Sequence, residues 1–233
     1  MRVEPQRTTG RALRTPRAAA IAGIVFSVLL SVSLVLIRST VPPGPIKSGN
    51  VALLPSSQSD IFFAVNLVPF AGIAFLWFMG VVRDRIGQRE DRFFATVFLG
   101  SGLLFVAMLF VSTAMAAGLL VTFQTAANNS ENLEVWRLGR NVTNTLIITY
   151  AMRMAGVFII STATIALRTE FMPRWMALLG YIVALVLLLS SGLLPYVELL
   201  FPVWVFLVSV YTLLVIEHSS ADSSSAAVRL PTG

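Results

Sequence analysis

Apolar residues run along the chain in six long stretches, separated by shorter polar segments. Each stretch is about 20 residues or longer, the length that a helix needs to cross the hydrocarbon core of a bilayer. The sequence therefore predicts an all-α fold, a polytopic bundle of six transmembrane helices. The expected helices are Ala18–Ile37, Ile61–Val82, Phe93–Thr122, Thr145–Leu167, Trp175–Leu194 and Val197–Ile216.

Three regions follow from this pattern. Residues 1–17 form a basic segment, residues 18–216 form the transmembrane domain, and residues 217–233 form a tail rich in Ser and Ala. The tail has no apolar period, so we expect it to be disordered. The first apolar stretch follows basic residues as a secretory signal would, but its core is too long for one, and we expect it to be retained.

Basic residues are divided unevenly between the two sides of the predicted bundle. With the N-terminus in the cytosol, twelve of the 17 Lys and Arg residues are cytosolic, four lie on the other side, and Arg153 lies within the membrane. Because cytosolic loops carry the excess of Lys and Arg, both termini are expected in the cytosol.

The amino-acid composition is also that of a membrane protein. Of 233 residues, 56% are hydrophobic and 12% are charged, whereas soluble domains carry about 25% charged residues. The net charge of +6 comes mainly from arginines beside the apolar stretches. Arginines at these positions are expected to contact anionic lipid headgroups, so nucleic acid is not an expected partner. Sixteen of the 17 basic residues are Arg, a bias typical of GC-rich bacterial genomes, and the expected location is a bacterial inner (plasma) membrane.

The chain lacks the side chains for common intramembrane chemistries. It has no Cys, and its single histidine, His218, follows the last predicted helix. Thiolate sites, a Ser-His dyad, and haem or zinc held by His are therefore excluded. No Asp lies within a predicted helix, and no phosphate-binding loop occurs. We expect no catalytic residue, no metal and no cofactor, and a protein that is not an enzyme.

Arg153 is the charge expected deepest in the membrane. It lies eight residues into the fourth predicted helix, about 12 Å along the axis, and such a residue normally faces a partner or water. Its expected neighbours, chosen by depth, form a polar cluster in the outer half of the membrane. The cluster contains Asn66, Thr149, Tyr150, Arg153 and Glu198.

This cluster has two interpretations. Arg153 is either the charge of an anion or solute site, because its guanidinium supplies five donors, or half of a buried structural salt bridge that fixes packing. The absence of a chain of intramembrane acids favours the structural interpretation.

Small residues recur every three or four positions along two predicted helices. Such ridges allow close approach by a neighbouring helix, inside the bundle or in a homodimer, and packing inside the bundle is favoured. The ridges are Ala19, Gly23, Ser27 and Ser31 in the first helix, and Ala177, Gly180 and Ala184 in the fifth.

The segment from Gly80 to Arg89 resembles the loop signature of major facilitator transporters, and like that signature it lies between the second and third helices on the cytosolic side. The resemblance covers ten residues and implies a gating role for Asp84 and Arg85, although Arg83 stands where that family has a small residue. The alternative, which we favour, is that these residues and Arg89 anchor the turn at the cytosolic face.

A wider run from Val68 to Phe110 is similar to multi-pass bacterial membrane proteins of unknown function, a likeness that extends over the second to fifth helices. This resemblance implies a membrane protein and no particular activity.

Two function classes remain. The favoured one is a non-catalytic membrane component that packs with a partner protein or with itself. The alternative is a small-solute transporter or channel, selective for anions and working as an oligomer, with Arg153 in its path. Water access to the Arg153 face distinguishes them, because only a carrier needs a hydrated path.

Overall fold

The computed structural model describes residues 15–40, 56–86, 92–125, 130–169, 172–189 and 196–228. Within these ranges 98% of the residues are helical and none lies in a strand, which confirms the all-α class. The elements are α1 (Thr15–Thr40), α2 (Ser56–Ile86), α3 (Arg92–Thr125), α4 (Ser130–Asn144), the π-helix η2 (Thr145–Ala151), α5 (Met152–Thr169), α6 (Arg174–Leu189), the 3-10 helix η3 (Val197–Leu199) and α7 (Leu200–Val228).

Five helical segments of the described ranges are long and apolar enough to cross a membrane, which supports a multi-pass membrane protein. The sixth apolar helix, α6, is shorter, with 16 residues, or about 24 Å of helix. The five long segments are Arg17–Arg38, Phe62–Arg83, Phe93–Leu119, Glu134–Thr169 and Val197–Val215.

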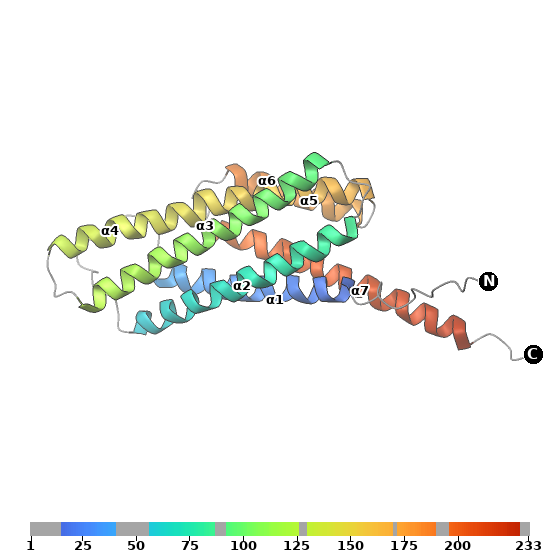
Figure 1. Cartoon of the computed structure of the whole chain (residues 1–233), viewed down its shortest axis with the longest axis horizontal. Coiled ribbons are helices and arrows are strands. Elements are labelled where there is room, and N and C mark those ends of the chain that lie inside the picture. The colour runs from blue at the N-terminus through green and yellow to red at the C-terminus, as the bar shows by residue number, and fades with distance from the viewer. Residues whose placement is uncertain are drawn as a thin grey trace, which may run out of the picture.

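The fourth predicted helix is part of a longer one. Helix is continuous from Ser130 to Thr169 through the π segment η2, so it begins well before the predicted start at Thr145. The added helix, α4, packs against α3, where Gly139 lies against Leu119. The whole element is about 60 Å long, twice the thickness of a hydrocarbon core. Figure 1 shows α4 and the neighbouring end of α3 reaching past α1 and α2.

The last helix also extends further than its apolar stretch. Helix α7 continues to Val228, whereas the sequence predicts disorder for residues 217–233, so over residues 217–228 the two differ. The physical reason is that this part contains no Gly or Pro, and backbone hydrogen bonding can continue a helix that apolar packing has already nucleated. In Figure 1 this end of α7 projects away from the bundle.

The long helices lie roughly side by side along one axis (Figure 1). Helix α1 packs along α2 and α7, and α5 packs against α3 and α6. Helix α1 begins and α7 ends at the same end of the bundle. Helices α2 and α5 also end there, and α3 and α6 begin there; we name this the terminal end. The opposite end, where α1 finishes and α7 starts, is named the distal end.

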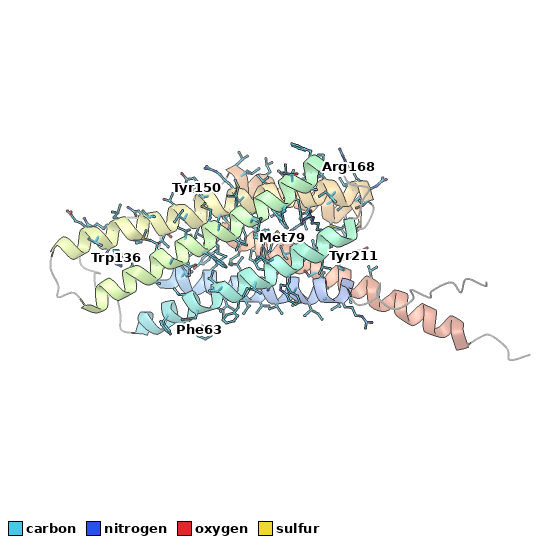
Figure 2. All side chains as sticks on the ribbon, viewed as in Figure 1. Phe63, Met79, Trp136, Tyr150, Arg168 and Tyr211 are labelled. Atoms are coloured by element: carbon cyan, nitrogen blue, oxygen red, sulfur yellow. The ribbon has the colours of Figure 1, made fainter. Side chains whose placement is uncertain are left out.

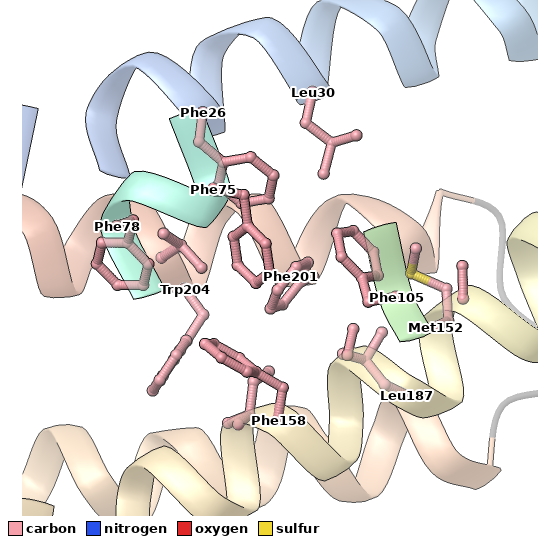
Figure 3. Close-up of a cluster of buried hydrophobic side chains, with 14 of the residues drawn as sticks. Phe26, Leu30, Phe75, Phe78, Phe105, Met152, Phe158, Leu187, Phe201 and Trp204 are labelled. Atoms are coloured by element: carbon pink, nitrogen blue, oxygen red, sulfur yellow. The ribbon is translucent and has the colours of Figure 1, made fainter. Parts of the chain in front are cut away.

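Aromatic side chains fill the centre of the bundle (Figure 3). The ring centroid of Phe75 in α2 lies 4.6 Å from the centroid of Phe26 in α1, 5.4 Å from that of Phe105 in α3 and 5.1 Å from that of Phe158 in α5. Phe201 of α7 completes the group at 4.8 Å from Phe105. All five rings are fully buried. Since lipid tails are as apolar as these rings, close packing rather than removal from water holds the helices together.

The small-residue ridges pack inside the bundle, as expected. In the first ridge Ala19, Gly23 and Ser27 are buried, and a Cβ on Gly23 would meet Ser209 of α7 and Phe78 of α2. The second ridge is buried as well. It consists of Ala177, Gly180 and Ala184.

Candidate functional site

A buried ion pair joins two elements at the distal end. Arg38 lies in the last turn of α1, and its guanidinium donates a hydrogen bond to a carboxylate oxygen of Glu198 in η3. The two side chains are 16% and 5% exposed. The other carboxylate oxygen of Glu198 is buried without a hydrogen-bond partner among the described residues. Such a pair, removed from water, holds only while both charges remain.

Tyr196 completes this group, which we call the distal clasp: Arg38, Tyr196 and Glu198. The guanidinium carbon of Arg38 lies 4.9 Å from the centroid of the Tyr196 ring, within cation–π range. Tyr196 has a left-handed backbone (φ 60°), and its carbonyl accepts a hydrogen bond from the Leu199 amide at 3.0 Å. This turn brings the ring and the carboxylate to the same guanidinium.

The distal clasp was only half visible in the sequence. Glu198 belongs to the predicted polar cluster, but its ion-pair partner is Arg38, one of the four basic residues predicted on the side opposite the cytosol. The available signal was position, because Arg38 directly follows the first predicted helix and Glu198 lies at the start of the last one, on the same predicted side of the membrane.

Asn66, another member of the predicted polar cluster, forms a hydrogen bond within its own helix. It is exposed, and its side-chain amide donates to the carbonyl of Phe62, one turn earlier in α2, at 2.7 Å. The contacts found for Asn66 and Glu198 are therefore with residues other than Arg153. The proposed grouping of all three remains a sequence-based prediction.

Arg153 lies in the first turn of α5, directly after the π segment, and is partly exposed. It takes part in an interaction within the structure. Thr149 and Tyr150 belong to the π segment; Thr149 is partly exposed, while Tyr150 is 53% exposed and points away from the bundle in Figure 2. The wider turn of a π-helix changes the angular spacing between these residues and Arg153.

The later part of the same helix faces α6. A Cβ on Gly156 would lie 3.2 Å from the carbonyl oxygen of Ala184, and the Thr164 hydroxyl is hydrogen-bonded to the Tyr181 hydroxyl at 2.7 Å. Here the small and polar positions serve helix packing.

The charged turn that resembles the major facilitator signature is partly within the described residues. Helix α2 continues to Ile86, so Arg83, Asp84 and Arg85 belong to its C-terminal end, and the Arg83 side chain is exposed. Arg89 lies outside the described residues.

Most buried hydroxyl groups donate a hydrogen bond to a backbone carbonyl of their own helix. Ser27, Thr113 and Thr162 each donate to the carbonyl four residues earlier, at 2.7 Å. This is the usual arrangement for hydroxyls surrounded by apolar groups. In the described part of the chain, no three His, Asp or Glu side chains are grouped so that they could hold a metal ion.

Comparisons with known proteins add no relative: no family model, no curated protein and no solved structure matches the chain.

Proposed function

We propose that this protein is a non-catalytic component of a bacterial plasma membrane, which packs against a partner membrane protein or a second copy of itself. The observation that carries the proposal is the aromatic core. Five rings from α1, α2, α3, α5 and α7 are fully buried, and the centroids of neighbouring rings are 4.6 to 5.4 Å apart, where a carrier would need a hydrated path.

The proposed orientation places both termini in the cytosol. It is supported by four exposed arginines at the terminal end, which suit the cytosolic face and its anionic headgroups. These are Arg17, Arg83, Arg168 and Arg174. In this arrangement the turn that includes Arg83, Asp84, Arg85 and Arg89 is a positive anchor. A fluorescent-protein fusion after Gly233 should be bright, and an alkaline phosphatase fusion there should be inactive; the reverse pattern would refute the orientation.

Flux through reconstituted protein tests the proposed function. Liposomes that contain the protein should lose chloride, phosphate and small neutral solutes no faster than empty liposomes. Energy transfer between labelled copies at decreasing protein-to-lipid ratio then separates self-association from a requirement for another partner. Solute loss that rises with the amount of protein would overturn the proposal.

A second candidate function is supported by one observation, the π segment next to Arg153. π-Helical turns are frequent at functional sites, and Arg153 is partly exposed beside one. In that case the protein is an oligomeric anion carrier or channel. Arg153→Gln would abolish an anion flux that the unmodified protein supports, while Arg137→Gln on the exposed side of α4 would leave it unchanged.

A further inference from the structure

An apolar groove runs along the outside of the bundle between α1 and α2. Its volume is about 770 Å³, and all of its lining side chains are apolar. Small residues such as Ala18, Ala22 and Ala74 leave the space. Phe70 and Trp77 of α2, 63% and 66% exposed, form its wall.

The groove has the length of one leaflet. Along α1 its lining extends from Ala18 to Leu29, or roughly 16 Å of helix. Along α2 it extends from Trp77 back to Leu67, or roughly 15 Å. Each distance is about half of a 30 Å hydrocarbon core, so a straight chain in the groove would reach from the terminal face to the middle of the membrane.

The two ends of the groove differ in charge. Ala18 and Trp77 mark the terminal end. Arg17 directly precedes Ala18, and Arg83, Asp84 and Arg85 follow Trp77 within three turns, so the net charge at this end is positive; the side chains of Arg17 and Arg83 are exposed. The other end, at Leu29 and Leu67, is apolar. A ligand that fits this pattern has a hydrocarbon chain and an anionic group at one end.

We propose that this groove binds an anionic phospholipid of the terminal-side leaflet, with one acyl chain along α1 and α2 and its phosphate at Arg17 and Arg83. Exposed tryptophan suits the same depth, because its ring is apolar and its N–H is polar. The proposal depends on the bundle spanning a membrane and not on whether the protein is a scaffold or a carrier.

A second copy of this chain is the less suitable occupant. A two-fold dimer about the membrane normal would bring the same face of both copies together. Arg17 and Arg83 of each copy would then lie at the same height, so that four positive charges would meet at one end of the interface. An anionic lipid brings the opposite charge instead.

Quenching of Trp77 by brominated lipids tests the proposal. The full chain with Trp136→Phe and Trp175→Phe is reconstituted in phosphatidylcholine vesicles that contain either dibrominated phosphatidylglycerol or dibrominated phosphatidylcholine at equal mole fraction. The Trp77 signal is the difference from a matched protein that also has Trp77→Phe, which removes the contribution of buried Trp204. Trp77 should be quenched more strongly by the brominated phosphatidylglycerol.

Two pairs of substitutions give the test its control. Arg17→Gln with Arg83→Gln should abolish the preference for phosphatidylglycerol, a loss in relative association constant of about fivefold for each arginine. Arg168→Gln with Arg174→Gln removes two exposed charges from the same end, outside the groove, and should leave the preference unchanged.

Three results would overturn the proposal. They are equal quenching by the two brominated lipids in the parent protein, equal effects of the two arginine pairs, and protection of Trp77 from both lipids that increases with protein density, which would identify a second copy as the occupant. Because all four arginines are exposed, the variants are expected to fold, and an unchanged Trp204 emission checks this.

Discussion

At the scale of single residues, the distal clasp contains a buried ion pair between two distant parts of the chain. Arg38 and Glu198 are 160 positions apart and join the end of α1 to η3, which directly precedes α7. Both side chains are largely buried, so each has given up water for the other. The pair therefore depends on both of its charges.

Removing only one charge should be worse than removing both. Arg38→Gln leaves a buried carboxylate unpaired and should lower the free energy of unfolding by about 3–5 kcal/mol. Arg38→Gln combined with Glu198→Gln leaves two neutral amides and should be less destabilising. The free energy of unfolding of each variant is measured in mixed detergent micelles. If the double variant lost as much stability as Arg38→Gln and Glu198→Gln lose in sum, a direct pair would be contradicted.

Gly23 and Ser209 form a second contact that two variants can probe. A Cβ on Gly23 would collide with Ser209 Oγ and lie 2.9 Å from a Phe78 ring carbon. Gly23→Ala should therefore destabilise the protein by about 1–3 kcal/mol through overpacking. Ser209 Oγ is buried without a hydrogen-bond partner among the described residues, so Ser209→Ala should be neutral or stabilising.

The combined variant distinguishes this contact from a general effect of the helix. With Ser209→Ala present, much of the loss caused by Gly23→Ala should disappear, as seen in thermal unfolding in detergent. Strict additivity of the two changes would mean that α1 and α7 do not approach each other at this point.

Depth along a helix predicted individual residues only in part. From depth we grouped Glu198 with Arg153, and that grouping remains a prediction. The ion pair that the structure shows joins Glu198 to Arg38, a partner that depth did not indicate because it depends on which helices are neighbours. That α1 packs along α7 comes from the tertiary arrangement. The burial of the small residues from Ala19 to Ser27, in contrast, was predictable from their spacing alone.

At the scale of elements, apolar length predicted the helices well and their ends less well. Hydropathy identifies segments that are apolar enough to be surrounded by lipid, and these segments are helices in the structure. It could not detect that α4 joins the next helix through η2, since α4 is polar and is held by packing against α3. It likewise could not predict that α7 continues to Val228.

The π segment gives a prediction about chain length. A π turn contains one residue more than an α turn, so deletion of Ile148 within η2 should convert it to regular α-helix and keep most of the packing on both sides. Deletion of Ile160 within α5 should rotate the following residues by about 100° and disrupt the contacts with α6. Folded yield after detergent extraction compares the two. Equal yields, or a lower yield for the Ile148 deletion, would contradict the π assignment.

At the scale of the whole molecule, the aromatic core and the exposed apolar surface describe a bundle that is packed inside and faces lipid outside. The rings of five helices meet at the centre, and the exposed side chains include many large apolar ones, among them Phe63, Trp77 and Leu178. The membrane class was predictable from composition, because the chain has too few charges for a soluble surface. The aromatic core was not, since it depends on which faces of the helices meet.

Water access to the centre tests the proposal of a packed scaffold most directly. The chain has no native cysteine, so single cysteines can be placed at the buried positions Ser112, Ser161 and Ser209, with Glu134→Cys on the exposed side of α4 as the reactive control. A small charged thiol reagent is applied to the protein in lipid vesicles open to it on both faces. We predict labelling of Glu134→Cys alone, with the three buried cysteines reacting only after denaturation. Rapid labelling of any buried position in the folded protein would reveal a hydrated path and contradict the packed core.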